Sequence, residues 1–293
     1  MLDRRTILSA LGAAPLVLNA AGSAAWAATD INAAIGSLER KAGGRLGAAA
    51  LDLQTGRAFA NRGDERFPLC STFKLSLAAL VLHRADAGKI RLDRRLRWTR
   101  ADLVPNSPAT TKAVDTGLTV AELSRDIIIH SDNTAANVLL DQVGGEAAMT
   151  AFWRQIGDPV SRLDRPETSM SEAKPGDVRD TTSPRAMLST VRTLTLGEAL
   201  SPASRKQLID WLVANTTGDT RIRAGLPKGW RVGDKTGTGG HGTSNDVAIA
   251  WPPGRKPVLI SIYLTGSKLE MKQRNAVIAE ASRALVNAGF GRA

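Results

Sequence analysis

Strand-like segments lie at both ends of this 293-residue chain, with a long run of helical patterns between them. Residues 46–53 and 57–60 flank Gln54-Thr55-Gly56, which has the composition of a hairpin turn. Residues 230–235, 246–251 and 258–264 are further strand candidates, joined by Gly- and Pro-rich turns. Because a sheet that includes all five segments must be built from both termini, we expect one five-stranded antiparallel sheet and a central helical insertion.

The central region has the apolar period of helices. Helices are predicted at residues 71–85, 120–129, 134–143, 146–156, 184–194 and 202–212. Two terminal helices, residues 30–41 and 269–287, flank the strands. The expected fold class is therefore α+β. Its parts are an α/β domain (residues 28–62 and 213–293), an all-helical domain (residues 63–212) and an active site in the cleft between them.

Residues 1–27 have the features of an export signal. Arg4-Arg5 precede an Ala- and Leu-rich stretch that ends in Ala25-Trp26-Ala27, a small-x-small cleavage pattern. The paired arginines favour the twin-arginine route. A membrane anchor is the alternative, but the stretch is shorter than the roughly 20 residues that a spanning helix needs. We expect cleavage after Ala27, a periplasmic protein and no membrane anchor after processing.

The chain is strongly basic, with a formal net charge of +11 and a sequence pI of about 10.4. Such a charge attracts anionic ligands and could serve nucleic-acid binding. The basic residues are densest at Arg91, Arg94, Arg95, Arg97 and Arg100, where few aromatic residues interleave with them. This pattern favours a solvated basic face, so we expect no nucleic-acid partner.

Cysteine and histidine are too sparse for a disulfide or a zinc site. Cys70 is the single cysteine, which excludes an intramolecular disulfide. His83, His130 and His241 lack the spacing to cysteines or carboxylates that zinc sites show. We expect no metal and no other cofactor.

Ser71-Thr72-Phe73-Lys74 is an S-x-x-K motif at the start of a predicted helix. Three residues turn a helix by about 300°, so the hydroxyl and the amine lie on one face, where the amine can deprotonate the hydroxyl. The backbone N–H of Ser71 lies at the helix N-terminus, which favours a negative oxygen. Alone, the motif fits a helix-capping serine better, and Ser171-Glu172-Ala173-Lys174 repeats it in a predicted loop.

Two further motifs supply the other groups that acyl transfer needs. Ser131-Asp132-Asn133 lies between two predicted helices, and Lys235-Thr236-Gly237-Thr238 ends a predicted strand. They offer a proton relay to a leaving nitrogen, an amide that holds a substrate and a cation for a carboxylate. Gly237-x-Gly239-x-x-Gly242 also matches a dinucleotide fingerprint, but a strand follows it instead of a helix, which argues against that use.

With S-x-x-K, S-D-N and K-T-G in this order, residues 28–293 resemble the class A serine β-lactamases. The resemblance extends to residues 162–167, which match the start of the family's Ω-loop, residues 162–180 here. It implies a monomeric enzyme that hydrolyses β-lactam antibiotics through a serine acyl-enzyme and confers antibiotic resistance. Its expected ligands are β-lactam substrates and inhibitors.

The resemblance also implies a role for each matching residue. The catalytic residues are Ser71, Lys74, Ser131 and Glu167, with Ser71 as nucleophile, Ser131 as proton relay and Glu167 as the base that activates the deacylating water beside Ser171. The oxyanion hole consists of the backbone N–H groups of Ser71 and Thr238. The substrate-binding residues are Asn133, Lys235, Thr236, Gly237, Thr238 and Arg221, and Arg165 pairs with Asp180 to close the Ω-loop. Whether Lys74 or Glu167 takes the proton of Ser71 stays open.

Several positions depart from common family patterns. Ser171 stands where many members have asparagine, and Asn106 replaces an aromatic residue at the cleft entrance. Thr168 stands where many have proline, which makes a cis peptide bond there costlier by about 3 kcal/mol. Gly239 stands where some members carry a second cysteine. Because no arginine lies near Ser244, Arg221 is expected to supply the additional contact to the substrate carboxylate.

Two other functions share part of this pattern. A D-Ala-D-Ala peptidase uses the same serine, lysine and K-T-G groups, and Glu167 is the residue that discriminates against it. A β-lactam-binding sensor would keep the pocket without turnover, but no membrane-spanning segment is predicted after residue 27. The preference among penicillins, cephalosporins and carbapenems stays open.

Overall fold

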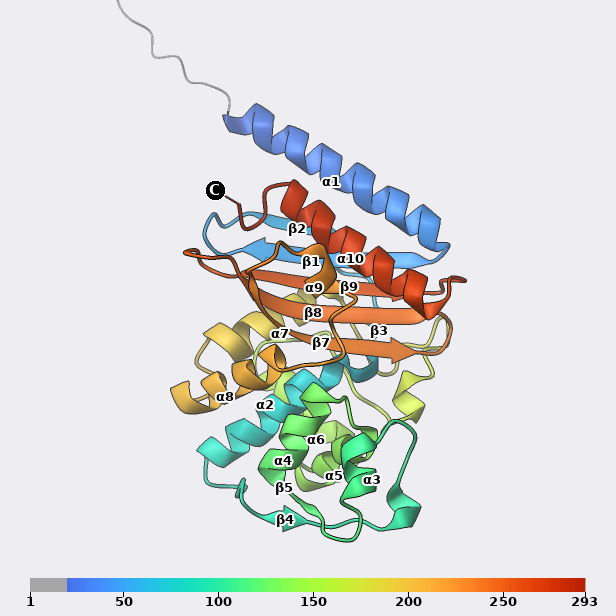
Figure 1. Ribbon diagram of the computed structural model, residues 1–293, viewed down its shortest axis with the longest axis vertical. Coiled ribbons are helices and arrows are strands. Elements are labelled where there is room, and N and C mark those ends of the chain that lie inside the picture. Colours follow the sequence, from blue (N-terminus) through green and yellow to red (C-terminus); the bar gives the residue numbers. More distant parts are fainter. Residues whose placement is uncertain (1–19, 293) are drawn as a thin grey trace, which may run out of the picture.

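The computed structural model describes residues 20–292, and its main sheet has five antiparallel strands in the order β2-β1-β9-β8-β7 (Figure 1). The N-terminal part supplies β1 (Arg45–Asp52) and β2 (Ala58–Asn61), and the C-terminal part supplies β7 (Arg231–Gly239), β8 (Thr243–Trp251) and β9 (Val258–Thr265). The two parts meet where β1 pairs with β9. The predicted sheet, built from both ends of the chain, is confirmed.

Helices cover both faces of this sheet. On one face lie α1 (Ala20–Ala42), α10 (Met271–Asn287) and the short α9 (Ile222–Gly225), and on the other lies α7 (Pro184–Leu196). Successive residues of a strand point to opposite faces. Along β9, Ile260 and Ile262 therefore join the core under α1 and α10, whereas Leu259 and Tyr263 join the core that includes α7.

A buried helix, α2 (Phe73–Asp86), is the centre of the helical part, which lies below the sheet in Figure 1. Residues 73–82 are all buried, as expected for a helix that is apolar on every side. Its neighbours are α4 (Val120–Ile129), α5 (Asn133–Gln142), α6 (Gly145–Gln155) and α8 (Pro202–Val213). The α+β fold class is confirmed.

The remaining elements are short. They are η1 (Cys70–Thr72), η2 (Arg100–Asp102), α3 (Pro108–Lys112), η3 (Ser169–Ser171), β3 (Phe67–Pro68) paired with β6 (Thr181–Thr182), and β4 (Arg95–Leu96) paired with β5 (Leu118–Thr119). Residues 162–180 form a loop whose only regular element is η3.

Several boundaries differ from the prediction; β8, for example, begins at Thr243 instead of residue 246. α1 begins at Ala20 instead of residue 30, consistent with the high helix propensity of the Ala-rich segment before it, and it spans the predicted cleavage site after Ala27. β7 continues to Gly239, because residues 236–239 pair with residues 243–246 of β8. Ser71 lies in η1, just before α2. Arg4 and Arg5 lie outside the described residues.

Candidate active site

Ser71 and Lys74 share one carboxylate oxygen. Ser71 is 9% exposed, and Lys74, in the first turn of α2, is fully buried. Ser71 Oγ donates to Glu167 Oε1 (3.0 Å), and Lys74 Nζ lies 3.1 Å from the same oxygen. Burial lowers the pKa of Lys74, although Glu167 favours its charged form. A lowered pKa favours the neutral amine, which is the form of lysine that can accept a proton.

The loop between α4 and α5 brings Ser131 and Asn133 to Lys74. Lys74 Nζ donates to the backbone oxygen of Ser131 (2.9 Å) and to Asn133 Oδ1. The buried carboxylate of Asp132 fixes this loop by accepting the backbone N–H groups of Thr110 and Ala135. Ser131 has a φ of 58°, a left-handed conformation that non-glycine residues rarely adopt and that recurs at functional sites.

Lys235 approaches Ser131 from β7. Its Nζ donates to Ser131 Oγ (3.1 Å) and to the backbone oxygen of Thr236 (2.9 Å). Burial, reinforced by the charge of Lys74, lowers the pKa of Lys235 to about 7. Lys235 therefore changes its charge near neutral pH.

The segment that carries Ser71 packs tightly against β7. A Cβ atom on Gly237 would lie 2.9 Å from the backbone oxygen of Leu69, so this close approach requires glycine. From β8, Asn245 Nδ2 donates to the backbone oxygens of Pro68 (2.9 Å) and Leu69 (3.2 Å). Both predicted oxyanion donors, Ser71 and Thr238, belong to the two segments joined here.

Arg221 is buried behind the end of β7. Its Nη1 donates to the backbone oxygens of Gly237 (2.7 Å) and Asn245 (2.6 Å), and its Nη2 donates to Thr238 Oγ1 (2.6 Å). Its Nε donates to Asn275 Oδ1 (2.9 Å). Because a guanidinium has five N–H groups, most of its donors hold protein atoms, and Arg221 is positioned to orient Thr238.

Hydrogen bonds hold the backbone N–H, the backbone oxygen and the carboxylate of Glu167. Asn137 Oδ1 accepts the N–H of Glu167 (2.9 Å), and Asn137 Nδ2 donates to its backbone oxygen (2.8 Å). Ser171 Oγ donates to Glu167 Oε2 (3.1 Å). The peptide bond between Glu167 and Thr168 is cis. The carboxylate thus faces Ser71 with one oxygen and Ser171 with the other.

The two ends of the Ω-loop meet at Asp180, which is 1% exposed. Asp180 Oδ2 accepts Arg165 Nε (2.6 Å), and Asp180 Oδ1 accepts the backbone N–H groups of Asp164 (2.7 Å) and Arg165 (3.0 Å). Arg165 and Asp180 are therefore in contact, as the family resemblance implies.

One cavity of about 570 Å³ collects these groups. The predicted site residues that line it are Ser71, Ser131, Asn133, Glu167, Ser171, Arg221, Thr236 and Thr238. Lys74, Lys235 and Gly237 contact this set from behind, and Arg165 and Asp180 lie at the base of the Ω-loop. Asn106, expected at the entrance, is also part of the lining.

Sequence reasoning missed five residues of the site. His130, Thr217 and Met271 line the cavity, and Met271 is the one apolar side chain of that lining. Asn137 and Asn275 hold Glu167 and Arg221. Asn137 lies four residues after Asn133 on α5, a helical spacing that could have indicated it. His130 directly precedes Ser131, so its place beside the S-D-N motif could also have been inferred. Thr217, Met271 and Asn275 are brought in by long-range packing that no local pattern reveals.

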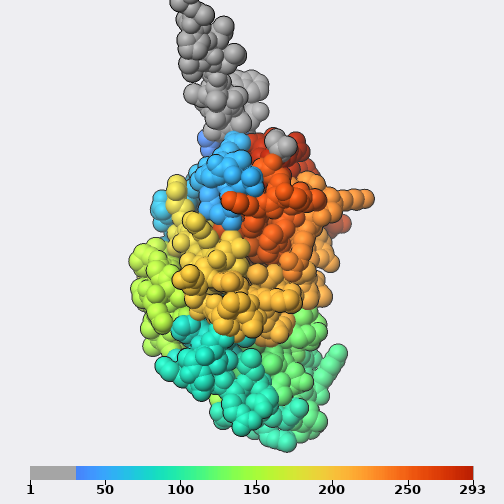
Figure 2. Space-filling view, turned by 90° about the vertical axis from the view of Figure 1, so that its left-hand side faces the viewer, coloured from blue at the N-terminus to red at the C-terminus, as the bar shows by residue number. Residues whose placement is uncertain are grey.

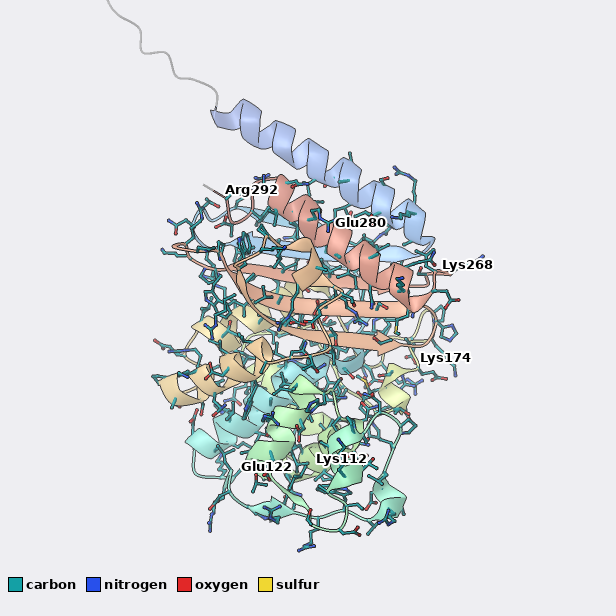
Figure 3. The ribbon with its side chains drawn as sticks, viewed as in Figure 1. Lys112, Glu122, Lys174, Lys268, Glu280 and Arg292 are labelled. Carbon is teal, nitrogen blue, oxygen red and sulfur yellow. The ribbon has the colours of Figure 1, made fainter. Side chains whose placement is uncertain are left out.

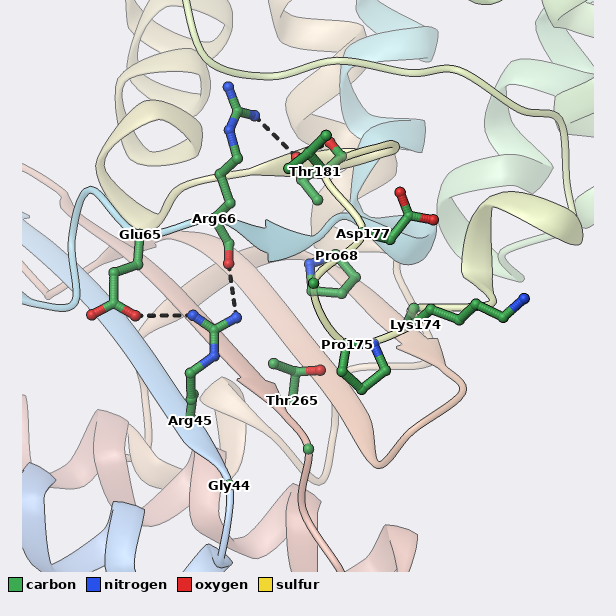
Figure 4. Close-up of a pocket in the computed structure, with 14 residues that line it drawn as sticks. Gly44, Arg45, Glu65, Arg66, Pro68, Lys174, Pro175, Asp177, Thr181 and Thr265 are labelled. Carbon is green, nitrogen blue, oxygen red and sulfur yellow. Dashed lines mark hydrogen bonds and ion pairs between the residues drawn. The ribbon is translucent and has the colours of Figure 1, made fainter.

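A second cavity, of about 590 Å³, lies against residues 173–178 of the Ω-loop (Figure 4). Its wall includes Arg45, whose guanidinium donates to Glu65 (2.9 Å) and to the backbone oxygen of Arg66 (3.0 Å). None of the predicted site residues lines it. Lys174, from the second S-x-x-K motif, pairs with Glu172 (2.6 Å) instead of with a serine. The cavity beside Ser71 is therefore the candidate active site.

No cluster of histidine, cysteine and carboxylate side chains within residues 20–292 could hold a metal ion. In the same part of the chain, none of the helices combines the length and apolarity needed to cross a bilayer.

Comparison with known proteins gives consistent matches over most of the chain. The sequence model of the beta-lactamase enzyme family matches residues 27–288. The carbapenem-hydrolyzing β-lactamase KPC of Klebsiella oxytoca is 47% identical over 284 residues, covering 96% of each chain. The β-lactamase Toho-1 of Escherichia coli is 42% identical over 287 residues, covering 98% of each.

The fold gives the same result. The class A β-lactamase of the last common ancestor of Gram-negative bacteria (GNCA4) has a TM-score of 0.87 at 60% identity, covering 88% of this chain and 98% of that one. These matches agree with the S-x-x-K, S-D-N and K-T-G motifs, whose side chains meet in one cavity. The chain therefore belongs to the class A serine β-lactamases, enzymes that hydrolyse β-lactam antibiotics and thereby confer antibiotic resistance.

Proposed function

We propose that Ser71 is the nucleophile of this β-lactamase. Lys74, Ser131 and Glu167 transfer protons during the reaction, and Lys235 binds the carboxylate of the substrate. One observation carries this assignment: five side chains from four distant segments form a single chain of contacts. Glu167 contacts Ser71 and Lys74, Lys74 contacts the backbone of Ser131, and the Ser131 hydroxyl contacts Lys235.

In acylation, Ser71 Oγ attacks the lactam carbonyl carbon, and its proton passes to the buried Lys74–Glu167 pair. Glu167 contacts both Ser71 and Lys74, so the Lys74–Glu167 pair takes up the proton as one unit. The backbone N–H groups of Ser71 and Thr238 stabilise the oxyanion, where one donor is typically worth a factor of about 10²–10³ in rate. The carbon–nitrogen bond then breaks, and the Ser131 hydroxyl donates its proton to the ring nitrogen while it receives the proton that the Lys74–Glu167 pair took from Ser71.

In deacylation, a water molecule attacks the ester carbon while Glu167 takes its proton. Glu167 Oε2 and Ser171 Oγ form the polar pair that would hold this water, since they are already 3.1 Å apart. The ester bond to Ser71 Oγ breaks, the serine recovers a proton and the opened ring leaves.

Substrate binding uses the β7 side of the cavity. Lys235, Thr236 and Thr238 bind the carboxylate of the β-lactam, the backbone of Gly237 borders the ring, and Asn133 bonds the side-chain amide. Arg221 contributes mainly by holding Thr238 and the end of β7, because four hydrogen bonds to protein atoms occupy its donors.

We further propose that the protein is exported as a monomer to the periplasm by a twin-arginine signal peptide, residues 1–27. The Arg4-Arg5 pair and the Ala25-Trp26-Ala27 pattern support this proposal. Cleavage after Ala27 retains Ile31 and Ile35, which are buried in the core between α1 and the sheet. The mature chain then consists of an α/β domain, residues 28–62 and 213–293, and a helical domain, residues 63–212.

Replacement of Glu167 by alanine tests the assignment. Glu167→Ala should react once with a penicillin and accumulate an adduct on Ser71, visible by intact mass, because its ester is no longer hydrolysed. The exposed Glu198→Ala variant serves as the matched control and should turn over a chromogenic cephalosporin like the wild type. Ser71→Ala should form no adduct.

Two results would contradict these roles. Rapid turnover by Glu167→Ala would show that Glu167 is not the deacylation base. Stoichiometric trapping of the drug by the wild type, without turnover, would point to a peptidase that penicillin acylates stably.

A further inference from the structure

The end of the helical domain farthest from α1 carries a dense group of cations, here called the basic tip: Lys89, Arg91, Arg94, Arg95, Arg97 and Arg100. All six are exposed, and Asp93 is the only carboxylate in residues 89–100. Figures 1 and 2 show this segment, with β4, at the lower end of the molecule.

Local structure directs these side chains outward. Leu96 and Trp98 are 6% and 7% exposed and belong to the core, so Arg95 and Arg97, which alternate with them, face solvent. Arg95 Nη1 donates to the backbone oxygen of Gly117 (2.7 Å), and Arg97 Nη1 donates to that of Asp115 (3.1 Å). These neutral acceptors hold the guanidinium groups in place without removing their charge.

Carboxylates neutralise only two of the six cations. Arg91 pairs with Asp93 (2.8 Å), and Arg100 pairs with Asp115 (3.1 Å), in exposed ion pairs that are weak in water. Within the part of the chain that the structure describes, the other four cations have no carboxylate at ion-pair distance. Asp102 and Asp141 line a cavity together with Arg94, Arg95 and Arg97, and Glu122 feels the charge of Arg95. The tip therefore keeps a net positive charge, which is smaller than its six cations alone would give.

We propose that the basic tip docks this protein on an anionic phospholipid surface. A rounded end with several unneutralised cations can approach many headgroups of a flat surface at once. Trp98, the one aromatic residue of the segment, is buried, so the tip offers no ring for base stacking, which disfavours a single-stranded nucleic acid. No residue of the tip lines the catalytic cavity, so docking leaves that cavity open.

Co-sedimentation with vesicles tests the proposal. The wild type should bind vesicles made of equal parts phosphatidylglycerol and phosphatidylcholine at low salt, and it should be released as salt rises past about 0.15 M, where charges are screened within about 8 Å. The tip variant Lys89→Gln/Arg94→Gln/Arg97→Gln should bind on the order of 100-fold more weakly, at about fivefold per cation.

A matched control removes the same charge from the α/β domain. Lys228→Gln/Lys256→Gln/Lys268→Gln changes three exposed lysines, of which Figure 3 shows Lys268 beside the sheet. This control should bind within about threefold of the wild type. Turnover of a chromogenic cephalosporin verifies that each variant is folded.

Four outcomes would overturn the proposal. Equal weakening of the tip variant and the control would mean that net charge alone drives adsorption. Retained binding by the tip variant would show that the basic tip does not bind the vesicles. Equal binding of the wild type to pure phosphatidylcholine would show that anionic lipid is not required. Tighter binding to a DNA oligonucleotide than to the vesicles at the same salt would make nucleic acid the partner.

Discussion

Lys74 and Lys235 are both fully buried, although an ammonium group normally stays in water. Hydrogen bonds to Ser131, Thr236 and Glu167 compensate for the lost hydration. The compensation is incomplete, since burial lowers the pKa of both lysines. The lowered pKa favours the neutral amine of Lys74, the form that can accept a proton, and it makes the charge of Lys235 sensitive to pH near 7.

The pKa of Lys235, about 7, predicts a pH-dependent KM for substrates that carry a carboxylate. Below this pKa the side chain is cationic and attracts the carboxylate. Above it the cationic fraction falls by up to tenfold per pH unit, so KM should rise from about pH 7 to about pH 9. Initial rates across this range measure the effect.

Lys235→Arg is the matched variant, because arginine stays charged throughout this range. Its KM should change much less with pH, whatever its absolute value. A wild-type KM that stays constant between about pH 6 and about pH 9 would contradict a titrating Lys235.

The candidate catalytic residues could be predicted because most of them belong to short sequence motifs. Ser71 and Lys74 are neighbours in sequence and contact the same oxygen of Glu167 in the folded chain. Ser131 and Asn133 are also neighbours in sequence, and both accept hydrogen bonds from Lys74. The residues that hold them could not be predicted in the same way. Asn275 reaches Arg221 only because α10 crosses the sheet beside α9, a contact that the tertiary fold determines.

Among the elements, the Ω-loop is closed by hydrogen bonds that converge on one side chain, Asp180. Residues 162–180 contain one short helix, η3, and Asp180 joins the two ends of the loop through Arg165 and Asp164. Because Glu167 lies in this loop, its position relative to Ser71 depends on that closure.

Asp180→Asn should loosen the Ω-loop while preserving side-chain shape. The substitution weakens the hydrogen bonds that Asp180 accepts from Arg165 and from two backbone N–H groups, which should lower the free energy of unfolding by about 1–3 kcal/mol. Glu172 (3.0 Å) still pairs with Arg165, so the guanidinium keeps a partner. Deacylation should slow more than acylation, which would appear as a burst of product followed by slow turnover.

Asp177→Asn provides the comparison within the same loop. Asp177 lies 3.6 Å from Arg165 and pairs mainly with the half-exposed Arg179 (2.8 Å), so its loss should change stability by at most about 1 kcal/mol. Equal effects of the two substitutions in denaturant titrations would contradict the special role of Asp180.

Most helices and all five strands of the main sheet follow from periodicity, because each has a clear apolar face or run. The differences arise where tertiary pairing overrides local preference. Gly237 and Gly239 disfavour a strand locally, yet β7 continues through them because β8 supplies hydrogen-bonding partners. Glycine is needed at position 237 because the backbone of Leu69 packs closely against it.

At the scale of the whole molecule, two hydrophobic cores lie on opposite faces of the main sheet. Leu285 of α10 belongs to the core under the terminal helices, whereas Leu77 of α2 belongs to the core of the helical part, and both are fully buried. The strands contribute alternate residues to each core, so damage to one core should be transmitted to the other.

Leu285→Ala and Leu77→Ala should each lower the free energy of unfolding by about 2–5 kcal/mol. Both variants should unfold in one cooperative transition, in which near-ultraviolet circular dichroism and enzyme activity are lost together. Two separated transitions in either variant would show instead that the cores are independent folding units.

The pairing of β1 with β9 also constrains how the protein is made. Ala48 lies opposite Ile262, so a strand synthesised early has its neighbour only near the end of translation. Such a distant contact closes slowly and only after most of the polypeptide has left the ribosome. A nascent chain that stops before Val258 would leave β1 without β9, and the cleft that depends on this sheet could not assemble.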